Sequence, residues 1–127
     1  MKSVKQSIVV RKDLNLKKGQ LSGLVSNASM KFILENNESE RPDELKVRLS
    51  HNEAQWLKNS LRCEVFGTES QDSLSDIAFR AEIQGLSVYS VFEEKADKDA
   101  DQVLLCIAIG PDEEDLIDQL TNGLKPL

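Results

Sequence analysis

Histidine is almost absent from this chain of 127 residues, and cysteine is scarce. The single histidine, His51, excludes a zinc site built on two histidines. The two cysteines, Cys63 and Cys106, lack the spacing of a disulfide framework or a metal site, which favours a reducing compartment and predicts a cytoplasmic protein. No apolar run approaches the ~20 residues of a membrane span, and the run at residues 7–10 is too short for a secretory signal.

Several enzyme motifs are also missing. The sequence has no G-x-S-x-G nucleophile elbow, no P-loop and no dinucleotide-binding fingerprint. Asp97, Asp99 and Asp101 alternate like calcium ligands, but this stretch lacks the glycine turn and the closing glutamate of an EF-hand loop. We therefore expect no cofactor and no metal.

The composition is that of a globular domain, with 39% hydrophobic and 30% charged residues. The net charge of −6 disfavours non-specific binding to nucleic acid. The charge is unevenly distributed, because residues 1–31 hold seven lysines and arginines against Asp13 alone. A local basic surface at the N-terminal end is therefore expected.

Apolar periodicity predicts alternating strands and helices. Strands are expected at residues 7–10, 62–68, 86–92 and 103–109. Helices are expected at 20–35, at 51–60, from Ser70 to Gly85, and from Pro111 to Asn122–Gly123. Residues 44–49 fit either a strand or a helix, so the structure of 36–53 stays open. The order predicts one layered α/β domain, residues 1–127, with a mixed four-stranded sheet.

Four residues of reactive or aromatic type, one histidine, one tryptophan and two cysteines, are expected to have no catalytic or ligand-binding role. His51 is predicted to lie on the surface, and Trp56 to anchor the core. Cys63 and Cys106 fall on predicted strands, so we expect buried, unreactive thiols.

Three stretches together resemble a known family. KQSIVVRKDLNLKKGQ (5–20) and AIGPDEEDLIDQLTNGLKPL (108–127) are similar to the two ends of the type II peptidyl-tRNA hydrolases. TESQDSLSDIAFRAEIQGLSVYSVF (68–92) is similar to the strand–helix–strand segment of that family, and Trp56–Leu57 stands where a Trp–Leu pair is common. The resemblance implies a three-layer α/β/α fold around a four-stranded mixed sheet, and often a homodimer.

The family's catalytic positions are largely substituted in this chain. Its first helix begins with a lysine after a loop glycine, followed by a glutamine and a histidine, where this chain has Gln20, Leu24 and Asn27 after Gly19. Its third strand ends in a catalytic aspartate followed by a threonine and a glutamine, and the matching positions here are Glu93, Asp97 and Lys98. The resemblance also leaves Lys18 as a basic residue beside the motif. The candidate site residues are Lys18, Gln20, Asn27, Glu93 and Asp97.

These substitutions lead to three hypotheses. The first is that the fold is kept but the mechanism is lost, so that the chain binds or regulates a tRNA or protein partner. The second is a divergent hydrolase of peptidyl-tRNA or a related ester, with Lys18 as cation and Glu93 as base. The third is an RNA-binding protein that uses residues 1–31. A cleft where Lys18 and Glu93 converge would favour the second, and a cleft plugged by Leu24 and Phe92 the first.

Overall fold

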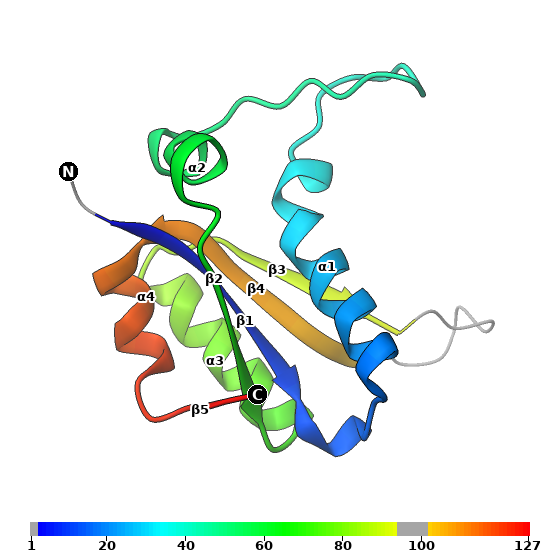
Figure 1. Ribbon diagram of the computed structural model, residues 1–127, viewed down its shortest axis with the longest axis vertical. Coiled ribbons are helices and arrows are strands. Elements are labelled where there is room, and N and C mark those ends of the chain that lie inside the picture. Colours follow the sequence, from blue (N-terminus) through cyan, green and yellow to red (C-terminus); the bar gives the residue numbers. More distant parts are fainter. Residues whose placement is uncertain (1–2, 94–101) are drawn as a thin grey trace.

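A mixed five-stranded sheet forms the centre of the molecule (Figure 1). The computed structural model describes residues 3–93 and 102–127. The strand order across the sheet is β3-β4-β1-β2-β5. β1 and β2 are parallel, and the other neighbouring pairs are antiparallel. The strands are β1 (Val4–Arg11), β2 (Cys63–Thr68), β3 (Val88–Phe92), β4 (Leu104–Glu113) and β5 (Lys125–Pro126).

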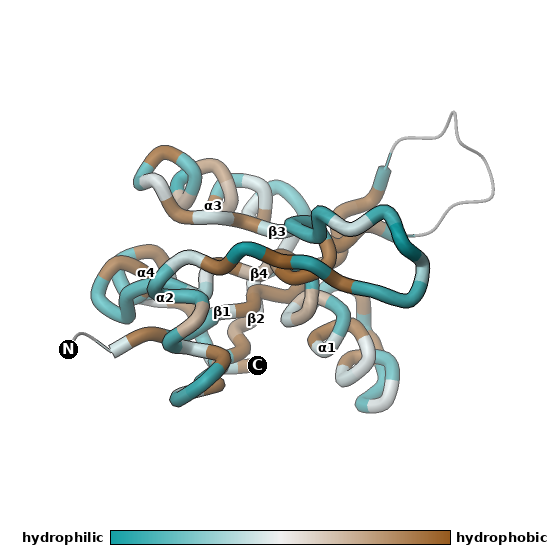
Figure 2. Tube along the Cα trace, turned by 90° about the horizontal axis from the view of Figure 1, so that it is seen from above, coloured by the Kyte–Doolittle hydropathy of each residue, from teal (hydrophilic) through white to brown (hydrophobic). Residues whose placement is uncertain are grey.

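Helices cover both faces of this sheet (Figure 2). On one face α1 packs through Ala28 and Phe32, together with Trp56 from the turn that follows α2. On the other face α3 and α4 pack against the central strands. The helices are α1 (Lys18–Glu35), α2 (His51–Gln55), α3 (Gln71–Ile83) and α4 (Glu114–Thr121), with a 3-10 turn η1 (Lys12–Leu14) and a π-helical turn η2 (Trp56–Ser60).

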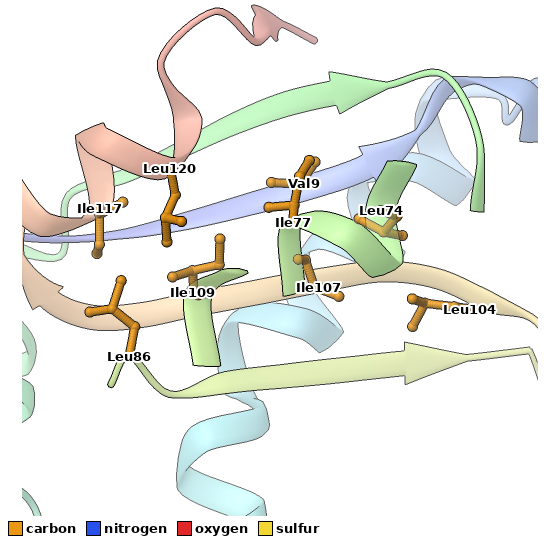
Figure 3. Close-up of a cluster of buried hydrophobic side chains, with 10 residues drawn as sticks. Val9, Leu74, Ile77, Leu86, Leu104, Ile107, Ile109, Ile117 and Leu120 are labelled. Atoms are coloured by element: carbon orange, nitrogen blue, oxygen red, sulfur yellow. The ribbon is translucent and has the colours of Figure 1, made fainter. Parts of the chain in front are cut away.

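The larger hydrophobic cluster lies between the sheet and the α3–α4 layer (Figure 3). Val9, Ile107 and Ile109 of the central strands contact this cluster together with Ile77 of α3 and Ile117 of α4. These five side chains are at most 2% exposed. Because full burial of such a side chain contributes about 1.5–3 kcal/mol, this cluster holds both helices firmly against the strands that carry the candidate site.

The helix ends confirm several predicted signals. The Ser50 Oγ accepts from the Glu53 N–H at 3.1 Å, and the Glu53 Oε1 accepts from the Ser50 N–H at 2.8 Å, which forms a capping box at α2. The Ser70 Oγ accepts from the Ser73 N–H at 3.2 Å at the start of α3. Gly85 follows α3 with a φ of +83°, a conformation that favours glycine. Trp56, at 4% exposure, lies in the core as expected.

The prediction that Pro111 opens the last helix is wrong. Pro111 lies within β4, after a cis Gly110–Pro111 bond, and α4 begins only at Glu114. Asp112 and Glu113, expected in the first helical turn, instead pair with β1. The backbone pairing that these residues gain with a central strand outweighs the helix-start signal of the proline and the acidic residues.

The predicted number of strands is also wrong, because β5 is a fifth strand. After Gly123, with a φ of +90°, the chain turns back and places Lys125 and Pro126 opposite Gly67 and Phe66 of β2. This pairing satisfies backbone groups at an edge of the sheet that would otherwise face solvent. Two residues are too short a strand to show a periodic pattern in the sequence.

Residues 36–50 form neither the strand nor the helix that the sequence left open. They make one isolated bridge between Asn37 and Val47 and otherwise follow an irregular path. Figure 1 shows this connection standing away from the sheet, and Figure 2 shows that it is mostly hydrophilic. With few apolar side chains to bury, the segment gains little by packing on the sheet.

β1 is longer than predicted because polar residues occupy its first half. Lys5 and Gln6 are buried in the sheet, at 2% and 0% exposure. The Lys5 Nζ donates to Glu64 at 2.7 Å and also to Asp118. The Gln6 amide donates to the Ser29 carbonyl at 3.1 Å and accepts from the Ser29 hydroxyl at 2.6 Å. These partners satisfy the polar groups, so a strand without apolar alternation can lie in the centre of the sheet.

Candidate functional site

One edge of the sheet brings together the ends of three strands. β1 and β2 are parallel, and β1 and β3 are both antiparallel to β4, so the carboxyl ends of β1, β2 and β3 share this edge. Helix α1 begins at the same edge, directly after the η1 turn that follows β1 (Figure 1). Open α/β sheets bind their ligands outside the carboxyl ends of the strands.

A cavity of about 550 Å³ opens at this edge. Helix α1 and the β1–α1 connection form one wall, and the adjoining ends of β3 and β4 form the other. The side chains that matter for its chemistry are Leu14, Leu16, Gln20, Leu24, Asn27, Glu93 and Leu105. The cavity is thus apolar at several points, with two amides and one carboxylate placed among the leucines.

The structure brings three of the five predicted site residues into this cavity. Gln20 and Asn27 lie seven positions apart on α1 and therefore share one face of the helix with Leu24. Glu93 follows β3, and its backbone N–H donates to the Val103 carbonyl at 2.8 Å, which ties the end of β3 to the start of β4. The backbone around the carboxylate is therefore held in place by the sheet.

Of the other two predicted residues, Lys18 does not line the cavity. Lys18 is the first residue of α1 and is exposed. Asp97, like Asp99, Asp101 and Lys98, lies outside the residues that the structure describes. The convergence of Lys18 and Glu93 that would favour the second hypothesis is therefore not observed. Leu24 lines the cavity without closing it.

The hydrogen bonding of Gln20 fixes the direction of its amide. Its Oε1 accepts from the Lys17 N–H at 3.1 Å, at the start of α1. With the carbonyl oxygen engaged there, the Nε2 group is the part of the side chain left to donate to a ligand. The Gln20 Nε2 group can therefore donate a hydrogen bond to a ligand in the cavity that Gln20 lines.

A cation held by several partners lies at the carboxyl end of β1. The Arg11 guanidinium donates to both carboxylate oxygens of Asp13, at 2.9 and 2.7 Å, and to the Leu104 carbonyl at 3.0 Å. It also donates to the Gln71 Oε1 at 3.1 Å. The hydrogen bonds with Asp13 raise the pKa of Arg11 despite its desolvation, and attraction to Glu93 adds to this effect. The same bonds lower the pKa of Asp13. Arg11 therefore stays charged.

Arg11, Leu14, Leu16 and Leu105 were not singled out from the sequence. The apolar residues of the β1–α1 connection, Leu14 and Leu16, alternate with polar ones in DLNL, and this pattern is a signal that a partly buried loop follows the first strand. Arg11 gives no such signal, since its partners Gln71 and Leu104 are remote in the sequence.

The two cysteines differ from each other. Cys106 is fully buried, and burial raises the pKa of its thiol to about 12, which confirms an unreactive core residue. The prediction of a buried Cys63 is wrong, because this residue is exposed at the start of β2. The reason is that β5 covers only Phe66 and Gly67 of that edge strand. Desolvation of the thiol, with the neighbouring Glu64, nevertheless raises the pKa of Cys63.

Alkylation is expected to distinguish these two thiols. Iodoacetamide at pH 8 should modify the folded protein once, at Cys63, and slowly because of the raised pKa. Mass spectrometry should find two modifications after denaturation and none in folded Cys63→Ser. Modification of Cys106 in the folded protein would contradict this assignment.

Within residues 3–93 and 102–127 no cluster of His, Cys, Asp and Glu side chains could hold a metal ion. His51 is exposed, as predicted. Among the helices of this part of the chain, none has the length and apolar character to span a membrane.

Comparison with known proteins identifies similar chains. The family model described as peptidyl-tRNA hydrolase PTH2 matches residues 4–127. A peptidyl-tRNA hydrolase of Nanoarchaeum equitans is 33% identical over 124 residues, which cover 96% of this chain and 97% of the relative. One of Methanopyrus kandleri is 30% identical, with 97% of each chain covered. A putative peptidyl-tRNA hydrolase of fowlpox virus is 29% identical, covering 98% of this chain and 90% of the relative.

Proposed function

This chain belongs to the peptidyl-tRNA hydrolase PTH2 family, and on that premise we propose that it hydrolyses the ester bond of peptidyl-tRNA or a related aminoacyl ester. The observation that carries the proposal is the placement of Glu93. Its carboxylate lines a cavity of about 550 Å³ together with the amides of Gln20 and Asn27. This cavity combines a proton acceptor, hydrogen-bond donors and space for a substrate.

In the proposed reaction the Glu93 carboxylate accepts a proton from a water molecule as the water oxygen attacks the ester carbonyl carbon. The negative charge that develops on the carbonyl oxygen accepts hydrogen bonds from the Gln20 and Asn27 side-chain amides. When the intermediate collapses, the bond to the ribose oxygen breaks and Glu93 returns its proton to that oxygen. The products are a peptide with a free carboxyl group and a tRNA with a free terminal hydroxyl group.

The roles of the remaining residues follow from their position and chemistry. Side-chain amides such as those of Gln20 and Asn27 do not accept protons near neutral pH. Of the three polar side chains that the structure describes in the cavity, Glu93 is therefore the proton acceptor. Leu24 and the other leucines give the cavity an apolar surface beside these polar groups. Lys18, exposed at the start of α1, is placed to pair with a phosphate of the substrate. Asp97 stays a candidate from the sequence alone.

A second candidate function is binding of tRNA without cleavage. The observation that favours it is Leu24, an apolar side chain in the cavity where the family resemblance leads us to expect a glutamine.

In either case we infer a cytoplasmic protein, since peptidyl-tRNA arises in translation, and a homodimer, since this is what the family resemblance implies. Sedimentation equilibrium tests the homodimer.

Single-turnover hydrolysis of purified peptidyl-tRNA, with the protein in excess, tests the proposal. Cleavage is expected to exceed the rate in buffer and to release the peptide with a free carboxyl group. The folded state of the protein is checked by circular dichroism in the same buffer. Absence of cleavage would overturn the hydrolase and leave binding without turnover as the function.

A further inference from the structure

The cavity of about 550 Å³ that Glu93 lines is named the reaction cavity. A second cavity, of about 310 Å³, lies at the same edge of the sheet. It opens where β2 ends and α3 begins, with β5 alongside. The residues that carry the argument are Lys12, Gly67, Thr68, Glu69, Ser73 and Lys125. They come from the η1 turn, β2, α3 and β5, so four separate elements meet around this cavity.

Lys12 reaches the cavity by lying across β2. A Cβ atom at Gly67 would stand 2.2 Å from the Lys12 Cε, so the absence of a side chain at Gly67 makes room for the lysine. Lys12 belongs to η1, the turn that continues to Leu14 in the wall of the reaction cavity. The turn therefore separates the two cavities and contributes a residue to each.

Thr68 contributes a hydroxyl group to the lining of this cavity, although the residue as a whole is only 7% exposed. A hydroxyl group can donate a hydrogen bond to a ligand oxygen. The Ser73 hydroxyl lies 3.1 Å from the Ser70 Oγ, which in turn caps α3, so a second hydroxyl stands at the positive end of a helix.

The charges around the cavity favour an anion. Lys12 and Lys125 form no ion pair with another residue in the described ranges, and the single carboxylate in the lining is that of Glu69. Two ammonium groups and two hydroxyl groups can donate hydrogen bonds, and a phosphate group carries the acceptors to match them. Glu69 opposes the binding of such a group.

We propose that this cavity binds one phosphate group of the RNA backbone, held by Lys12, Lys125 and the hydroxyl groups of Thr68 and Ser73. The choice of RNA rests on the proposed function, because peptidyl-tRNA is the substrate of that function. A phosphate held on the far side of η1 positions the acceptor end of the tRNA beside the reaction cavity. The two cavities thus bind two parts of one substrate.

Binding of fluorescein-labelled deacylated tRNA, followed by anisotropy at several KCl concentrations, tests this phosphate site. The variant Lys12→Gln/Lys125→Gln is expected to bind about tenfold more weakly, and the slope of log K against log[KCl] should become shallower by about 0.7. The matched control is Lys46→Gln/Lys58→Gln, which removes the same charge from exposed positions outside this cavity. We expect the control to change the affinity less than twofold and to keep the slope.

Thr68→Val separates a binding role from a structural one. It replaces the hydroxyl by a methyl group of similar size, so we expect about fivefold weaker tRNA binding with an unchanged or higher Tm. A lower Tm with unchanged affinity would assign the hydroxyl to the fold and overturn its role here. Glu69→Gln is expected to strengthen binding, because it removes the opposing charge.

The outcomes distinguish this site from the proposed function, because binding of deacylated tRNA needs no cleavage. If the wild-type protein fails to cleave but the two double variants differ as expected, the hydrolase is overturned and the phosphate site stands. If the wild-type protein cleaves peptidyl-tRNA but the two double variants bind tRNA equally, the phosphate site is overturned. It is also overturned if the wild-type protein does not bind deacylated tRNA. A third outcome is that inorganic phosphate shifts the amide resonances of Thr68 and Ser73 while the two double variants bind tRNA equally. This result would assign the cavity to free phosphate and overturn the RNA assignment.

Discussion

Replacing Glu93 by glutamine is expected to lower the single-turnover rate of peptidyl-tRNA cleavage by about 10²–10⁴, because the loss of a general base typically has an effect of this size. The amide keeps the shape and the hydrogen-bonding oxygen of the carboxylate but cannot accept the proton of the attacking water. Affinity for deacylated tRNA should stay within about twofold of wild type, since a general base acts on the transition state.

The control for this variant is Glu82→Gln, which removes the same charge from an exposed position on α3. It is expected to cleave at the wild-type rate. Gln20→Leu and Asn27→Leu each remove one proposed donor to the oxyanion and should lower the rate by about 10²–10³. A Glu93→Gln protein that cleaves as fast as the Glu82→Gln control would exclude Glu93 as the base.

The double replacement Glu64→Gln/Asp118→Asn is expected to lower the free energy of unfolding by about 3 kcal/mol at neutral pH. Lys5 is 2% exposed and bonds to both carboxylates, so the variant leaves a buried ammonium group without a counter-charge. The value lies at the lower end of the usual range because the Glu64 and Asp118 side chains are 34% and 51% exposed, and water reaches them. Urea unfolding measures the difference.

Adding Lys5→Met to this double variant removes the buried charge itself. The triple variant is expected to recover most of the lost stability, because an apolar side chain of similar length costs little to bury. If the triple variant is as unstable as the double one, the effect arises from the loss of side-chain packing and not from the uncompensated charge.

The same ion pairs predict a loss of stability at alkaline pH. Burial alone would lower the pKa of Lys5, but its hydrogen bonds and ion pairs with Asp118 and Glu64 outweigh burial and raise the pKa above the ordinary value of 10.5. A group whose pKa is higher in the folded state stabilises the fold below its unfolded pKa. This stabilisation is lost as the pH rises from 10.5 through the folded value. Urea unfolding above neutral pH should show this loss in the wild type and not in Lys5→Met.

The sequence predicts the elements whose side chains follow a simple period, and misses those stabilised by distant partners. The capping signals at Ser50 and Ser70 depend on neighbours three residues away, and both are confirmed. The first half of β1 carries polar residues whose partners, such as Asp118, lie at the other end of the chain. Pro111 reads as a helix start because nothing local reveals that its segment pairs with β1.

The same distinction holds for the two cavities. The spacing of Gln20, Leu24 and Asn27 on one helix is visible in the sequence, and the structure places all three in the reaction cavity. Thr68 has no such signal, because its proposed role depends on two lysines that three-dimensional folding brings near it. This role in binding could therefore be inferred only from the structure.

The pairing of β1 with β4 determines how late in its synthesis the protein can complete its sheet. Ile8 lies opposite Ala108, so almost the whole chain must leave the ribosome before the first strand acquires its antiparallel neighbour. Until then β1 has only β2 beside it, and one row of its backbone groups stays open to other chains. The nascent polypeptide is therefore most prone to aggregation just before β4 pairs with β1 and completes the wall of the reaction cavity.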